Sequence, residues 1–248
     1  MRLSRKRAII TGASQGIGAE IAKAFAREGA SVALVHRSSG KHEDPVAKSI
    51  VESGGDASSV HADVSDPASV KRAFSTAGRR LGGLDILVNA AGFSDARLWK
   101  AGIRKARLDD WKAVFSVDAF GTFLCSQAAI KQMKRGSIIN VASTPAVSGD
   151  SDGLVYAAAK GAVLSMTRML AKELAPDIRV NCMVFGSIET GWVNWLDARD
   201  AANYRKAIPM KRFGTPSDAA LLATYLASDE SSFMTGQAIV LDGGEVMR

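Results

Sequence analysis

Short apolar runs of strand length alternate with longer helix-like stretches along the whole chain. We expect strands at residues 7–11, 31–36, 58–61, 84–89, 137–142, 178–184 and 237–241. We expect helices at about 17–28, 44–53, from 67 onwards, from Asp109 or Asp110 to about 134, at 154–174 and from 216 onwards. Strands that alternate with helices form βαβ units, so the pattern predicts an α/β fold with helices on both faces of a parallel sheet.

The chain of 248 residues has no internal repeat and no low-complexity linker. We therefore expect residues 1–248 to form one domain. The least regular stretch, residues 188–212, contains Trp192, Trp195 and Tyr204, and we interpret it as a segment that covers a substrate site rather than as a domain boundary.

A glycine-rich turn lies between the first predicted strand and the first predicted helix. Its sequence is Gly12-Ala-Ser14-Gln15-Gly16-Ile17-Gly18. In a doubly wound sheet this turn places the pyrophosphate of a dinucleotide on the free N–H groups of the helix. The pattern favours a Rossmann-like, seven-stranded parallel fold and predicts that Gly12, Ser14, Gln15, Gly16, Ile17 and Gly18 bind the cofactor. A glycine-rich loop without a ligand is the alternative.

The end of the second predicted strand indicates which cofactor is bound. An acidic residue there would accept hydrogen bonds from the ribose of NAD, but this chain has His36-Arg37-Ser38-Ser39. A guanidinium can bind a phosphate with two parallel hydrogen bonds, and a serine hydroxyl can add another. Arg37 and Ser38 therefore favour NADP(H) over NAD(H), unless Arg37 is only a surface residue.

Tyr156 and Lys160 are four residues apart on a predicted helix, and Ser143 precedes them by thirteen positions. Residues with this spacing share one helix face. The positive charge of the lysine should lower the pKa of the tyrosine, which could then exchange a proton with a carbonyl or hydroxyl oxygen that the serine also holds. By chance alone, such a pair is more often a surface tyrosine and a solvated lysine.

Charge and composition limit the partners. The net charge is +7, but only 6% of the residues are aromatic and no recognition motif joins them to the basic clusters, so nucleic-acid binding is not favoured. The charge can instead attract an anionic cofactor or an acidic acyl carrier protein.

The two cysteines and three histidines have no metal-ligand spacing. No apolar run approaches the ~20 residues of a membrane span, and the basic start lacks a secretory apolar stretch, so we expect a cytoplasmic protein.

These motifs together resemble the single-domain short-chain dehydrogenases/reductases over nearly the whole chain. The resemblance rests on the glycine turn, Asp63-Val64, Asn89-Ala90-Ala91-Gly92, Ser143, Tyr156-x-x-x-Lys160 and the closing stretch 235–244. Within the family, the chain is most similar to 3-oxoacyl-carrier-protein reductases and to sugar or polyol dehydrogenases. The family implies a homo-oligomer, a tetramer or dimer, formed through the two long helices and the last strand.

The resemblance also implies roles for single residues. Asp63 and Val64 should contact the adenine, and Asn89, Ala90, Ala91 and Gly92 should line the cofactor, although Asn89 could instead only bond within the sheet. Ser143 should orient the substrate oxygen, Tyr156 should act as general acid or base, and Lys160 should hold the ribose and tune Tyr156. The stretch Gly186, Ile188 and Thr190 should lie near the nicotinamide carboxamide.

The chain departs from the family pattern at two positions. Asp118 stands where the family has an asparagine that serves proton supply, and Phe185 replaces a proline. An aspartate would stabilise the Lys160 ammonium and partly cancel its effect on Tyr156, so we expect a working enzyme with a shifted pH profile. A weakened enzyme and a substitution without consequence are the alternatives. Phe185 can pack against the ligand or simply in the core.

The sequence thus predicts an NADP(H)-dependent oxidoreductase for a ketone or secondary alcohol. Substrate contacts are expected from residues 93–97, 144–149 and 188–204. The alternative is a protein that senses the nicotinamide cofactor with weak or no catalysis, which only Asp118 and Phe185 support.

Overall fold

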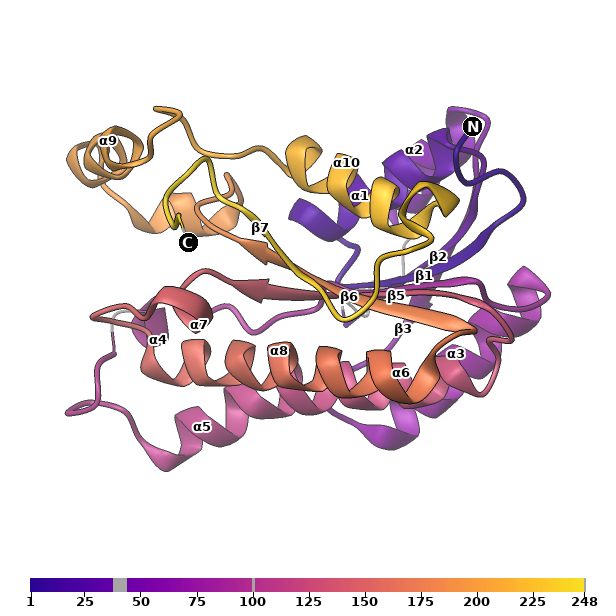
Figure 1. The fold of residues 1–248 in the computed structure, drawn as a ribbon, viewed down its shortest axis with the longest axis horizontal. Helices are drawn as coiled ribbons and strands as arrows, with labels where there is room; N and C mark the ends of the chain where they lie inside the picture. The colour runs from indigo at the N-terminus through magenta and orange to yellow at the C-terminus, as the bar shows by residue number, and fades with distance from the viewer. Residues whose placement is uncertain (38–43, 100, 248) are drawn as a thin grey trace.

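The computed structural model describes residues 1–37, 44–99 and 101–247, and it is built on a seven-stranded parallel sheet in the order β3-β2-β1-β4-β5-β6-β7 (Figure 1). The strands are β1 (Arg7–Thr11), β2 (Ser31–His36), β3 (Asp56–His61), β4 (Ile86–Asn89), β5 (Gly136–Ser143), β6 (Ile178–Phe185) and β7 (Ala238–Leu241). Every neighbouring pair is parallel. The predicted fold is therefore confirmed, with strand ends that differ by two residues or fewer.

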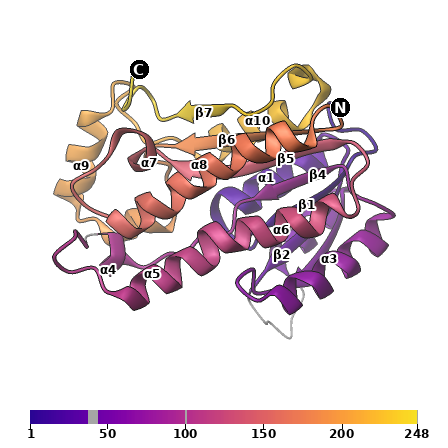
Figure 2. The same ribbon diagram turned by 60° about the horizontal axis from the view of Figure 1, so that its bottom comes forward.

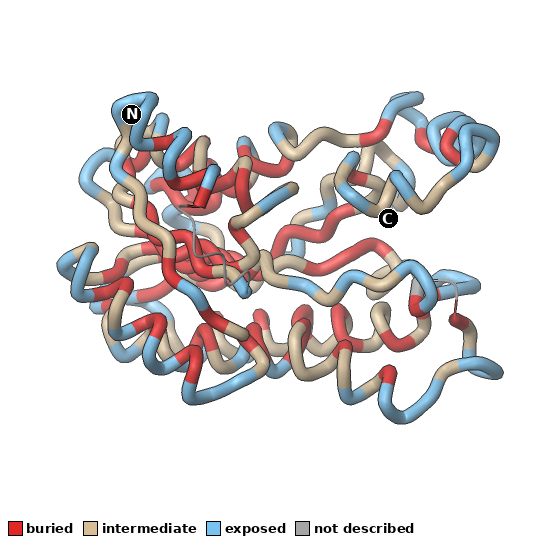
Figure 3. Tube along the Cα trace, turned by 180° about the vertical axis from the view of Figure 1, so that it is seen from behind, coloured by how far each residue is buried: buried red, intermediate tan, exposed pale blue. Residues whose placement is uncertain are grey.

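Helices cover both faces of the sheet (Figure 1). One face carries α1 (Gly16–Arg27), α2 (Pro45–Glu52) and α10 (Pro216–Ala227), and the other carries α3 (Pro67–Leu81), α6 (Gly121–Ile130) and α8 (Leu154–Leu174). Each layer buries its own apolar cluster against the strands, as the red stretches of the tube show (Figure 3). The strands are buried on both sides, which explains why they are almost continuously apolar in the sequence.

The strand order reverses between β1 and β4. From β1 the chain builds outward to β2 and β3, and then returns to add β4 on the other side of β1. In open α/β sheets a ligand crevice forms at this switch point, outside the carboxyl ends of the strands. The short helices α4 (Ala96–Trp99) and α7 (Pro145–Ser148), together with α9 (Ala198–Ala207), gather at that end of the molecule (Figure 1).

The long helix predicted to end near residue 134 is interrupted. It consists of α5 (Leu108–Phe115), a π-helical segment η1 (Ser116–Phe120) and α6, which ends at Ile130. A π segment inserts an extra residue into the turn and is common at functional sites. Apolar periodicity does not reveal one extra residue, so the sequence did not indicate it.

The same helix, Leu108–Ile130, is long and apolar enough to cross a membrane by length and composition alone, contrary to the expectation that no apolar run approaches a membrane span. In the structure it runs beside α8, and the views agree on this arrangement (Figure 2). Asp118 lies fully buried in its middle. Of the apolar window of this helix, 44% is buried inside the domain.

The segment 188–212 contains a 3₁₀ turn, η2 (Gly191–Trp195), and α9. It is joined back to the domain by a parallel bridge between Ile188 and Gly214 and by a hydrogen bond of 2.7 Å from Glu189 N to Gly214 O. It therefore extends from the carboxyl end of β6 as a flap anchored at both ends.

Candidate active site

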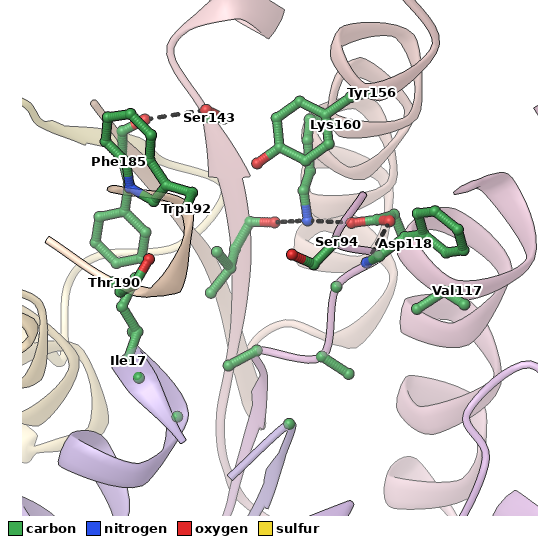
Figure 4. A pocket seen from close by; sticks show the side chains of 18 of the residues that line it. Ile17, Ser94, Val117, Asp118, Ser143, Tyr156, Lys160, Phe185, Thr190 and Trp192 are labelled. Atoms are coloured by element: carbon green, nitrogen blue, oxygen red, sulfur yellow. Dashed lines mark hydrogen bonds and ion pairs between the residues drawn. The ribbon is translucent and has the colours of Figure 1, made fainter. Parts of the chain in front are cut away.

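A cavity of about 1020 Å³ lies at the carboxyl ends of the strands. It is lined by nearly all of the residues that the sequence singled out (Figure 4). They are Gly12, Ser14, Gln15, Gly16, Ile17, Gly18, Arg37, Asp63, Val64, Ala90, Ala91, Gly92, Asp118, Ser143, Tyr156, Lys160, Gly186, Ile188 and Thr190. Residues far apart in the sequence thus meet in one space large enough for a dinucleotide and a small substrate.

The glycine turn has the form that a pyrophosphate requires. Gly12 has a φ of +68°, and a Cβ there would lie 2.7 Å from Ala91 Cα and 2.8 Å from Ala90 O. The side chain of Gln15, at the N-cap of α1, makes no capping hydrogen bond, whereas Asp44 and Asp66 cap α2 and α3. The first N–H groups of α1 therefore face the cavity without a side-chain cap, and they suit an anionic group.

Arg37 lies at the end of β2, exposed and lining the cavity. It lowers the pKa of Asp63, although a hydrogen bond from Ser65 contributes most to that shift. His36 beside it pairs with Asp44, with 2.6 Å between Nε2 and Oδ2. The predicted contact of Ser38 lies outside the described residues.

Asn89 differs from the expectation that it lines the cofactor. Its side chain is buried in the sheet, and Nδ2 donates to Asn140 Oδ1 at 2.9 Å and to Ser126 Oγ at 3.1 Å. Asn140 in turn donates to Thr167 Oγ1. Asn89 therefore ties β4 to β5 and α6 beneath the cavity, which is the alternative left open for it above.

Tyr156 and Lys160 project from the first turns of α8 toward the same space, opposite Ser143 at the end of β5 (Figure 4). The Lys160 ammonium lies 5.5 Å from the centre of the Tyr156 ring, and it donates to Val141 O at 3.3 Å. The Ser143 hydroxyl donates to Phe185 O at 3.2 Å. Phe185 is itself buried and belongs to a core cluster, and it also lines the cavity, so its ring can contact both the core and a bound ligand.

Asp118 forms an ion pair with Lys160, with 2.6 Å between Oδ1 and Nζ. Both side chains are out of solvent, at 0% and 5% exposure. The other carboxylate oxygen accepts a hydrogen bond of 3.0 Å from Phe93 N. Asp118 thus holds the loop after β4 and the lysine of α8 at the same time, from a π-helical turn that faces α8 (Figure 4).

The pKa of Tyr156 departs from the sequence-based expectation. Burial raises it, and the nearby Asp118 carboxylate raises it further. The Lys160 charge and a hydrogen bond with Ser143 act in the opposite direction but do not compensate. The pKa of Lys160 is also raised, because the attraction of Asp118 and Tyr156 outweighs the cost of burying the ammonium. The direction of this contribution agrees with the expectation that Asp118 partly cancels the effect of Lys160 on Tyr156, and its consequence for the enzyme stays a prediction.

The far end of the cavity is formed by the flap and the C-terminal segment. Trp192 stacks edge-on against Tyr204, with 6.0 Å between the ring centres, and its Nε1 donates to Ile188 O. Two acidic residues that the sequence motifs did not indicate, Asp150 and Glu245, also line the cavity here. Glu245 comes four residues after the end of the last strand, at the carboxyl edge of the sheet. Because ligands bind at that edge, this position in the sequence could have indicated that Glu245 lines the site.

Comparisons with known proteins agree with this site. A family model described as enoyl-(acyl carrier protein) reductase matches residues 12–245. A short-chain dehydrogenase/reductase of Serratia marcescens has a similar structure, with a TM-score of 0.91 at 31% identity over 99% of both chains. The chain therefore belongs to the short-chain dehydrogenase/reductase family, and the resemblance seen in the sequence is confirmed.

The relatives are enzymes of several names. A 3-oxoacyl-[acyl-carrier-protein] reductase of Chlamydia pneumoniae is 38% identical over 243 residues, which is 96% of each chain. The glucose 1-dehydrogenase 2 of Bacillus subtilis is 35% identical over 98% of this chain and 95% of its own, and the meso-2,3-butanediol dehydrogenase of Serratia marcescens is 34% identical over 98% and 96%. This chain is accordingly an NAD(P)-dependent oxidoreductase for a ketone or secondary alcohol.

Proposed function

We propose that this protein is an NADP(H)-dependent carbonyl reductase and alcohol dehydrogenase in which Tyr156 is the general acid and base. The observation that carries the proposal is the convergence of Ser143, Tyr156 and Lys160 on one cavity whose other end is the uncapped start of α1. A nicotinamide cofactor, when bound, supplies or accepts the hydride.

The residues of the chain handle the substrate oxygen and its proton. In reduction, the Tyr156 hydroxyl donates its proton to the developing alkoxide oxygen, and in oxidation the phenolate accepts it. Ser143 orients the same oxygen by exchanging its 3.2 Å hydrogen bond to Phe185 O for one to the substrate. Lys160 supplies a positive charge that stabilises the phenolate and can hold ribose hydroxyls.

Arg37 supports NADP(H) over NAD(H). It is an exposed guanidinium at the carboxyl end of β2, and the cavity wall there continues with Asp63 from the neighbouring strand. A 2′-phosphate placed beside Arg37 would gain a charge-assisted, bidentate hydrogen bond.

The proposed function is tested by NADPH oxidation, followed at the nicotinamide absorbance, over a panel of ketones, keto sugars, diketones and a 3-oxoacyl thioester. We expect turnover of at least one ketone. Tight NADPH binding without turnover of any compound would instead favour the cofactor-sensing alternative, which rests on Asp118 and Phe185.

We also propose a homo-oligomer, a tetramer or dimer, in the cytoplasm. Apolar side chains are exposed at the end of η1 and along α6 and α8, among them Phe120, Phe123 and Met169, with exposures of 59%, 44% and 66%. Packing of these helices against a second copy would bury them. Light scattering would show the assembly as a multiple of the 26.1 kDa chain mass.

A further inference from the structure

Among the described residues that line the substrate end of the cavity, the unpaired charges are of one sign. The basic residues among the described lining residues are His36, Arg37 and Lys160. His36 and Arg37 lie at the end of β2, and Lys160 is neutralised by Asp118 at 2.6 Å. The lining residues that remain charged around the flap are carboxylates, Asp95, Asp150 and Glu245.

Two of these carboxylates have no cationic partner among the residues that the structure describes. Asp95 has the guanidinium of Arg97 at 3.9 Å, whereas the ion pairs of the described residues include neither Asp150 nor Glu245. Glu245 instead accepts hydrogen bonds from Ser187, at 3.3 Å from N and 3.4 Å from Oγ. These bonds fix its carboxylate beside the carboxyl end of β6.

The carboxylates act on one another and on Tyr204. Partial burial raises the pKa of Glu245, and Asp242 and Asp150 raise it further. Burial also raises the pKa of Tyr204, and the carboxylates of Asp150, Asp200, Glu245 and Asp152 raise it further. Arg205 on the same helix lies over the ring of Phe213, 4.9 Å from its centre, and does not line the cavity.

Aromatic rings complete this end of the cavity. Trp192, Trp195 and Tyr204 all line it, and Trp192 is held edge-on between Tyr204 and Phe213, at 6.0 and 5.7 Å between ring centres. The faces of indole and phenol rings attract cations, and most strongly alkylammonium groups, which are weakly hydrated. Carboxylates next to aromatic rings therefore favour a substrate with a cationic group over one with a neutral or an anionic group.

We propose that the preferred substrate is a ketone or secondary alcohol that carries an amine or alkylammonium group, which binds between Glu245, Asp150 and the rings of Trp192 and Tyr204. This inference rests on the proposed function, because the reacting oxygen must lie at Tyr156 while the cation lies under the flap. An anionic substrate would meet repulsion from both carboxylates.

The test compares three methyl ketones of the same chain length. One ends in a trimethylammonium group, one in the isosteric tert-butyl group and one in a carboxylate. Turnover is measured as kcat/KM with NADPH. Binding is measured by calorimetry to the enzyme saturated with oxidised NADP, with which a ketone cannot react.

We expect the ammonium ketone to exceed the tert-butyl ketone by about ten-fold in both measurements, with the carboxylate ketone weakest. The double variant Glu245→Gln/Asp150→Asn should bring the ammonium-to-tert-butyl ratio close to one. Asp56→Asn removes one negative charge from an exposed residue at the other end of the sheet, and it should leave that ratio unchanged.

Equal or better use of the tert-butyl or carboxylate ketone would overturn the inference while leaving the proposed function intact. A ratio that persists in the double variant would overturn it as well. Charge-selective binding that Glu245→Gln/Asp150→Asn abolishes, without turnover of any ketone, would uphold the cation site and refute the proposed function.

Discussion

The carboxylate of Asp118 and the ammonium of Lys160 form a buried ion pair, with 2.6 Å between Oδ1 and Nζ, directly below the phenol of Tyr156. The loop after β4 lies against this pair, since a Cβ on Gly92 would be 3.3 Å from Asp118 Oδ1 and 3.8 Å from Lys160 Nζ. The charge of the lysine is therefore shared between a fixed carboxylate and the tyrosine, and we expect Asp118 to influence the pH at which the enzyme works.

Asp118→Asn should move the pH–rate profile to lower pH. Asp118 raises the pKa of both Tyr156 and Lys160, so its removal lowers both. In alcohol oxidation, which needs the phenolate, the rising limb shifts toward lower pH. In ketone reduction, which needs the protonated phenol, the falling limb shifts the same way. The amide oxygen can still accept from Phe93 N. If neither the limb for alcohol oxidation nor the limb for ketone reduction shifts, the role of Asp118 is contradicted.

Arg37→Ala should discriminate between the two cofactors. Loss of a charge-assisted, bidentate contact to a 2′-phosphate should weaken NADPH binding by about ten-fold to a hundred-fold. NADH has no phosphate at that position, so its affinity should change little. Calorimetry with both cofactors measures the difference. Arg27→Ala, on the far turn of α1, serves as the control. Equal losses for NADPH and NADH would show that Arg37 does not select the cofactor.

Gly12→Ala and Gly54→Ala form a matched pair. Both glycines have positive φ, +68° and +82°, so each alanine costs about 1–2 kcal/mol of backbone strain. At Gly54 no atom lies within 4 Å of the new Cβ, whereas at Gly12 it would overlap Ala90 and Ala91. Gly12→Ala should therefore lose roughly 1–3 kcal/mol more in the free energy of unfolding, and NADPH affinity with it. Denaturant titration measures the free energy of unfolding of the two variants, and calorimetry measures their affinity for NADPH. Equal destabilisation of the two variants would show that the turn at Gly12 is loosely packed.

Much of the fold and of the cavity could be predicted because it depends on local patterns. Gly12, Gly16 and Gly18 come between an apolar run and a helix, and parallel strands bring their carboxyl ends to one edge. Tyr156 and Lys160 share a face because a helix repeats every 3.6 residues. The order of motifs was enough to identify the family.

The remainder depends on packing that the sequence does not display. The π segment 116–120, which aims Asp118 at α8, adds a single residue that periodicity averages out. The raised pKa of Tyr156 results from burial, which outweighs the lysine charge visible in the sequence. Asp150 and Glu245 are almost a hundred residues apart in the sequence, and both line the cavity because the C-terminal segment returns to its rim.

The most direct test of the central claim is Tyr156→Phe, which removes one oxygen and keeps the ring. Under conditions in which the native protein reduces a ketone, we predict that kcat falls by about two to four orders of magnitude, while the dissociation constant for NADPH, measured by calorimetry, stays within about two-fold of the native value. A Tyr156→Phe protein that retains the native kcat would show that another group supplies the proton and would contradict this account.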